Sequence, residues 1–327
     1  MKRKKINSKA LRSRRLWGFF IFLTAILLLW AFGYSLQKGE PLVVYKQSSS
    51  KLKLSLKNFS PIAGANYELW QITPNQEISL GKFNLNAEGQ LIDAYGQTIL
   101  GAFFDLSTSS EETKSFKITI EPQLDDSLEA SPIEMVSGKK AKPLEKTSAK
   151  LEFILDFSQI SGNYFLISPT DGNTNSNENA GIWFFQEVNK MPIPSLNLPI
   201  LPEGWKYESW IVYENETFSL GKFTDPGVND EANKFSGPKS APAFPGEDFL
   251  RKSEPNFTQK LPFKLNNGST QIFLTLEPDQ QGTDPTGDRP FFLQFLNATI
   301  NKDAPVHTVL PLTLDLGKIP SAKIQIQ

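Results

Sequence analysis

Outside one long apolar run near the amino terminus, apolar and polar residues alternate along the chain with a period of two. In residues 51–57, Leu52, Leu54 and Leu56 alternate with lysines and a serine. This alternation is typical of β-strands that have one buried and one solvent-facing side. The same pattern returns at residues 116–120, 151–157, 272–276 and 310–316.

Clusters of Gly, Pro, Asn and Asp separate these segments, which predicts turns between antiparallel strands. No segment outside the apolar run keeps a helical period. We therefore predict an all-β fold, with two tandem antiparallel β-sandwich domains behind one N-terminal transmembrane helix. The predicted parts are a basic cytoplasmic tail (1–15), a transmembrane helix (16–36), a stalk (37–50), domain 1 (51–168), a linker (169–190) and domain 2 (191–327).

The apolar run, Leu16 to Tyr34, contains nineteen residues and no charge. As a helix it would extend about 28 Å, close to the hydrocarbon thickness of a bilayer. Eight basic residues and no acid precede it, which predicts a signal anchor with the amino terminus inside and the bulk of the chain extracytoplasmic. A cleaved secretory signal ending near Ala31 to Gly33 is the alternative, and both interpretations place residue 37 onward outside the cytoplasm.

One stretch occurs twice. Residues 67–83 read YELWQITPNQEISLGKF and residues 207–223 read YESWIVYENETFSLGKF, with nine of seventeen positions identical. Farther along, residues 118–122 match 274–278, and residues 155–157 match 314–316. The chain is therefore an internal duplication of one folding unit, and the second copy carries an insertion mostly between Phe223 and Leu274.

The repeated stretch supplies the candidate site residues. Strand alternation places Tyr67 and Leu69 on one face and Glu68 and Trp70 on the other. The matched tryptophans indicate core packing, with partner or carbohydrate binding as the alternative, and the glycines indicate a bulge or a close backbone approach. The candidate residues are Tyr67, Glu68, Trp70, Gly81, Phe83, Tyr207, Glu208, Trp210, Gly221 and Phe223.

The insertion in the second copy, residues 224–262, is rich in proline and glycine. Long loops of this kind are often functional. We predict a candidate binding loop within it, formed by Phe244, Pro245, Gly246, Glu247, Asp248 and Phe249.

Composition restricts the chemistry. The absence of cysteine excludes disulfides, zinc sites with cysteine ligands and thiol nucleophiles. The net charge is −1, but the basic residues concentrate in the tail, so the remaining chain is acidic and a nucleic-acid partner is disfavoured. His307 is the single histidine and lacks the context of a catalytic triad. We predict no enzyme activity, catalytic residue, cofactor or metal, although a paired-carboxylate hydrolase and calcium-binding acidic loops remain open.

The Y-E-x-W and S-L-G-K-F elements resemble the extracytoplasmic domain of the anti-sigma-K factor (regulator of sigma K) family. In the second copy the resemblance continues through residues 243–249, 275–278 and 288–291. It implies a bacterial single-pass plasma-membrane protein with an all-β outer domain. Family members also carry a cytoplasmic domain that binds the sigma factor, and only about fifteen residues precede the apolar run here.

We therefore predict a membrane-anchored extracytoplasmic binding or sensing protein, with a protein partner in envelope signalling or a cell-surface ligand. The alternative is a structural or adhesive envelope module that binds glycan or another surface protein.

Overall fold

The structure is a computed structural model, and it describes residues 50–327 except 109, 125–126, 140–147, 173–175, 254, 256 and 281–282. The chain from Ser49 to Gln327 forms one compact unit. The predicted basic tail, the predicted transmembrane helix and all but the last residue of the predicted stalk lie outside the described residues. Within the described residues the fold is all-β, with the short 3₁₀ turns η1 (Leu100–Ala102) and η3 (Glu178–Ala180), and no helix there has the length and apolarity to cross a bilayer.

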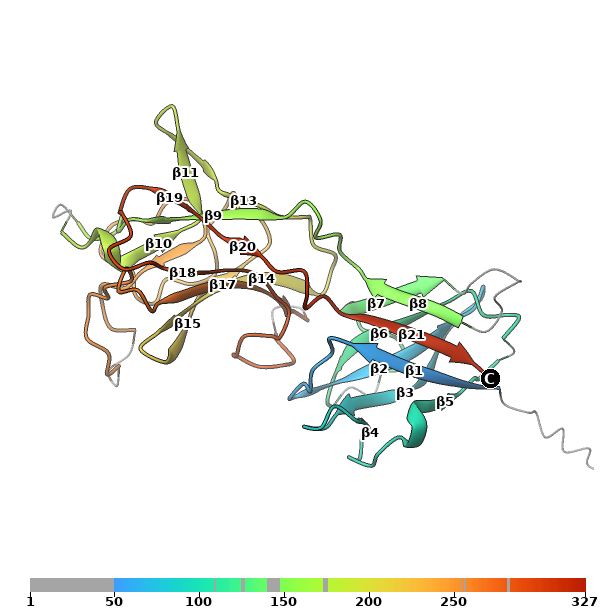
Figure 1. The fold of residues 1–327 in the computed structure, drawn as a ribbon. Coiled ribbons are helices and arrows are strands. Elements are labelled where there is room, and N and C mark those ends of the chain that lie inside the picture. The colour runs from blue at the N-terminus through green and yellow to red at the C-terminus, as the bar shows by residue number, and fades with distance from the viewer. Residues whose placement is uncertain are drawn as a thin grey trace, which may run out of the picture. The chain divides into compact units, whose positions relative to one another are not determined.

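The first sheet runs in the order β4-β3-β2-β6-β7-β8-β21-β1-β5 (Figure 1). In β1, Leu52 and Leu54 are buried between exposed lysines, so the predicted alternation is confirmed. The strands of this sheet are β1 (Lys51–Lys57), β2 (Ala65–Ile72), β3 (Glu77–Leu85), β4 (Leu91–Asp93), β5 (Phe103–Asp105), β6 (Ser115–Pro122), β7 (Glu134–Lys139), β8 (Ser148–Phe153) and β21 (Ser321–Ile326).

The second copy contains three further sheets. A five-stranded sheet has the order β15-β14-β17-β18-β20, a second has the order β13-β9-β10-β16 with β19 on β9, and β11 pairs with β12 alone. Their strands are β9 (Ser161–Leu166), β10 (Gly181–Trp183), β11 (Phe185–Val188), β12 (Met191–Pro194), β13 (Leu196–Asn197), β14 (Trp205–Tyr213), β15 (Glu216–Phe223), β16 (Gly246–Asp248), β17 (Gln271–Pro278), β18 (Gln294–Thr299), β19 (Val309–Pro311) and β20 (Thr313–Leu314).

The duplication is visible in the strand register. Tyr67 pairs with Phe83 across β2 and β3, and Tyr207 pairs with Phe223 across β14 and β15. Both hairpins carry a register shift immediately before the matched tryptophan. One hairpin, with one bulge, is therefore built twice.

The last strand of each copy lies in a sheet of the other copy. If the match of residues 155–157 to 314–316 is continued without a gap, β9 aligns with β21 within one residue. Yet β9 pairs with β10, β13 and β19 of the second copy. In return β21, drawn in red, lies between β8 and the blue β1 of the first copy (Figure 1). The two copies thus exchange equivalent strands.

Four strands consequently differ from the predicted domain limits. β9 lies in the predicted domain 1 and β21 in the predicted domain 2, but each joins the other copy. The predicted linker, residues 169–190, contains β10 and β11. Its residues Ile182 and Phe184 are fully buried in the main core, which explains why this segment is ordered as strand.

Both ends of β21 are fixed to β1. The Asn58 side-chain amide, after β1, donates to the carbonyls of Gly317 and Ile319 at 2.8 and 2.9 Å. Asn58 has φ of 60°, a left-handed conformation that asparagine adopts more readily than most residues. At the other end the amide of Gln327 donates to the Lys51 carbonyl at 2.7 Å. These bonds hold the chain's last strand in place beside its first.

Candidate functional site

In the first copy, the signature residues belong to a buried hydrogen-bond network. Trp70 donates from Nε1 to the Thr119 hydroxyl at 2.8 Å, and that hydroxyl donates to Glu121. The Glu121 carboxylate also accepts the Ser131 amide at 3.0 Å, and the Ser79 hydroxyl donates to Glu68. Trp70 is 1% exposed and does not belong to the main apolar core. Its face of the sheet is therefore covered by polar contacts.

The second copy repeats this network with its own residues. Trp210 donates to Thr275 at 2.8 Å, Thr275 donates to Glu277, and Glu277 accepts the Phe291 amide at 2.9 Å. The Ser219 hydroxyl donates to Glu208 at 2.5 Å. Both copies build the same tryptophan–threonine–glutamate and serine–glutamate hydrogen bonds from matched residues, which favours a structural role for the signature.

The tyrosines and phenylalanines of the signature lie on the opposite face, in the core. The Tyr67 hydroxyl donates to the Ser60 carbonyl and the Tyr207 hydroxyl to the Pro199 carbonyl, both at 2.8 Å. Burial raises the pKa of both tyrosines above the ordinary value. The ring of Tyr67 lies 5.5 Å from Phe83, and that of Tyr207 lies 5.7 Å from Phe223, between centroids.

The two signature glycines share a conformation but differ in surroundings. Gly81 and Gly221 have φ of 132° and 123°, which side chains rarely adopt. A Cβ on Gly221 would lie 2.5 Å from Asp230 Oδ1, whereas the nearest atom to a Cβ on Gly81 is 3.9 Å away, in Phe104. The register shift places both glycines beside the predicted bulge, and at Gly221 alone a carboxylate also approaches closely.

The predicted binding loop, residues 244–249, lies inside the protein. All six residues are buried, and Gly246 to Asp248 form β16, which pairs with β10. Asp248 accepts from Trp183 Nε1 at 2.7 Å and from the Thr170 amide at 2.8 Å. The predicted binding loop is therefore enclosed: its carboxylates satisfy buried donors, and a partner in solvent does not reach them.

Several buried carboxyl groups have raised pKa values. Burial raises the pKa of Glu208 and of Asp230 to about 7, of Asp248 to about 6 and of Glu277 to about 8. Glu277 is fully buried, and within the described chain its Oε2 has no hydrogen-bond partner. Such groups could exchange protons with a substrate only if solvent reached them, and Glu208, Asp248 and Glu277 are at most 5% exposed, whereas Asp230 is half-buried. In the described ranges no set of three or more His, Asp or Glu residues is placed to hold a metal ion.

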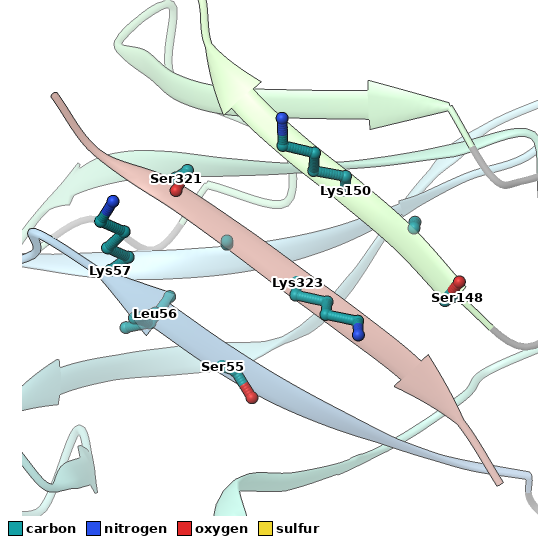
Figure 2. A pocket seen from close by; sticks show the side chains of 9 residues that line it. Ser55, Leu56, Lys57, Ser148, Lys150, Ser321 and Lys323 are labelled. Carbon is teal, nitrogen blue, oxygen red and sulfur yellow. The ribbon is translucent and has the colours of Figure 1, made fainter.

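A different surface is open to solvent. The outward sides of β1, β21 and β8 form what we call the lysine face, over a groove of about 440 Å³ (Figure 2). Its lysines and serines come from three adjacent strands, and the inward residues between them are buried core. The lysine face consists of Lys51, Lys53, Ser55, Lys57, Ser148, Lys150, Ser321, Lys323 and Gln325.

Strand register brings like charges together on this face. Lys323 is the direct cross-strand partner of Lys150 and of Ser55. Two like charges opposite each other destabilise a sheet. Glu152, on the same side of β8, contacts Lys150 at 2.5 Å, and Asp105 lies opposite Lys51. Five lysines against these two carboxylates leave the face basic, although the chain outside the tail is acidic.

Sequence reasoning identified only part of this surface. The alternation of Lys51, Lys53 and Lys57 with leucines was visible, but it indicated only a half-buried strand. The neighbouring lysines lie far along the chain, on β8 and β21. The alternation of Ser321, Lys323 and Gln325 with apolar residues indicated a second half-buried strand. Which strands lie beside this one, however, is decided by the strand exchange.

Comparison with known proteins adds no relative. No family model, no curated protein and no solved structure matches the chain.

Proposed function

We propose that the chain is a membrane-anchored extracytoplasmic binding protein and not an enzyme. Its two β-sandwich copies follow a transmembrane helix at residues 16–36 and a stalk at 37–50. The observation that carries the proposal is the lysine face, a basic surface held on a sheet whose first strand begins where the stalk ends. Lysines held on adjacent strands place several positive charges side by side, which suits recognition of an anionic partner.

The two signature networks have similar geometry in the two copies, and this similarity supports the binding role indirectly. Both sets of carboxylates are enclosed and hydrogen-bonded, which favours a scaffold over a reactive site. The resemblance to the outer domain of anti-sigma-K factors would assign such a scaffold to envelope signalling, in which the short basic tail meets a separate cytoplasmic partner.

Crosslinking in intact cells, followed by purification from the membrane in mild detergent, tests this function. We expect partners captured by the full chain to be reduced in the triple variant Lys53→Gln, Lys57→Gln, Lys323→Gln. Substitution of Lys239, Lys252 and Lys260, which are exposed lysines elsewhere, is the matched control. Added protease should digest residues 50–327 in intact cells, and full protection from it would rule out an extracytoplasmic location.

A second candidate function, an adhesive module for another surface protein, is favoured by the β11–β12 hairpin. Val188, Met191 and Ile193 share one face of this hairpin and are 45%, 63% and 37% exposed. Exposed apolar residues gathered in this way are typical of protein contacts. Met191→Ser should abolish capture of such a partner, while Glu187→Ser, on the other face, should not.

A further inference from the structure

We propose that the lysine face docks on the anionic phospholipid headgroups of the membrane in which the chain is anchored. This inference rests on the proposed function, because it requires the predicted anchor. It adds the chemistry of the partner, which is a lipid surface that carries phosphate groups.

The first argument is position. β1 begins at Lys51, directly after the predicted stalk, and the lysine face runs along this strand. The fourteen stalk residues would span on the order of 20 Å as a flexible chain and about 48 Å when fully extended. A tether of this length keeps the face at millimolar effective concentration near the headgroups, so that weak attraction suffices for docking.

The second argument is charge. The lysine ammonium group is a compact charge on a flexible stem, so it can pair with a phosphate without a fixed geometry. Each lysine near an anionic membrane surface favours binding by about fivefold, and the effect decays within about 8 Å at physiological salt. Lys53, Lys57 and Lys323 lie on adjacent strands of one sheet and can approach a flat surface together.

The third argument is the character of the face. The outward positions carry lysine, serine, glutamine and, at the end of β8, Glu152, and none is apolar; the apolar Leu56, Ala149 and Ala322 line only the groove between them. A face that inserts into acyl chains would carry apolar or aromatic residues there. Serine hydroxyls between lysines instead donate to phosphate oxygens at the headgroup level. The unfavourable Lys323 and Lys150 pairing becomes favourable when a layer of phosphates lies over it.

The test uses the full chain reconstituted into vesicles of phosphatidylcholine alone or with phosphatidylglycerol, and an amine-reactive label that does not cross the bilayer. With phosphatidylglycerol we expect labelling of Lys53, Lys57 and Lys323 to fall at least about fivefold. One molar salt should restore the labelling, because it shortens the screening length to about 3 Å. Lys239 and Lys260 should label equally in both vesicles.

Two results separate the inference from the function on which it rests. Extraction of the protein from either vesicle by alkaline carbonate would overturn the anchor and the docking together. Retention after carbonate, with equal labelling of the face in both vesicles, would overturn the docking alone. A third result would also overturn the docking on phospholipid. If the lysine face in phosphatidylcholine vesicles is protected from the label only when soluble linear polyphosphate is added, its partner is an anionic envelope polymer.

Discussion

Leu54 and Ile324 pair directly across β1 and β21, although they lie near opposite ends of the described chain. Both are buried in the main core, at 1% and 0% exposure. The first copy of the duplication is therefore completed by the last strand of the second. Because such a contact closes a very long loop, the two copies depend on each other for stability.

Deletion of residues 318–327 should destabilise the first copy. The edges of β1 and β8 would lose their partner strand, and unpaired edges promote association. We expect a lower urea midpoint and loss of amide protection in β1 and β8. A peptide of residues 318–327 should restore both, while the same peptide with Ile324→Asp should not.

A point variant keeps this prediction testable if the shortened chain does not fold. Ile324→Ala in the full chain should lower the free energy of unfolding by about 2–4 kcal/mol, as for other large buried aliphatic residues. Gln325→Ala, at the next and exposed position, should change it by less than about 0.5 kcal/mol. Equal effects of the two substitutions would contradict the strand exchange.

The two signature glycines should respond differently to the same substitution. Gly81→Ala should cost about 1–2 kcal/mol, because only the backbone is strained. Gly221→Ala should cost clearly more, because its Cβ would also collide with Asp230 Oδ1, 2.5 Å away. Urea unfolding of both variants measures this, and a larger loss for Gly81→Ala would contradict the difference in surroundings.

Local patterns in the sequence predicted the strands and the repeat, because both depend on neighbouring residues. The alternation at 51–57 and the shared signature each appear as a strand or hairpin in the structure. The partner of each final strand could not be predicted. β9 (SGNYFL) carries its apolar residues together, whereas β21 (SAKIQI) alternates them, and nothing in either pattern indicates which copy's sheet the strand joins.

Candidate sites were harder to predict for a related physical reason. The residues Glu247 and Asp248 resemble a binding loop because charge usually lies on the surface. Here they are 0% exposed and satisfy donors from residues 170 and 183 and from 234–236. The lysine face, in contrast, depends on three strands that are distant in sequence, so its charge density appears only after the sheet is assembled.

The threonine at the centre of each network should matter equally in both copies. Thr119→Val and Thr275→Val each leave a buried tryptophan N–H without its acceptor and a carboxyl group without one of its donors. We expect each to lower the free energy of unfolding by about 1–3 kcal/mol. Thr313→Val, at an exposed position, is the control. A loss in only one copy would show that the networks are not equivalent.

Stability should fall as the pH rises, because burial holds the pKa of Glu277 at about 8, above the ordinary 4.5. Between these values the folded protein keeps a proton that the unfolded chain releases, so the free energy of unfolding decreases with a slope of up to about 1.4 kcal/mol per pH unit for this group. Glu277→Gln removes this titration and should reduce the fall of the urea midpoint from pH 5 to 8, leaving the fall contributed by Glu208, Asp230 and Asp248, whose pKa values burial also raises. Glu187→Gln, at an exposed position, should leave the slope unchanged, and an equal slope in both variants would show that Glu277 does not titrate in this range.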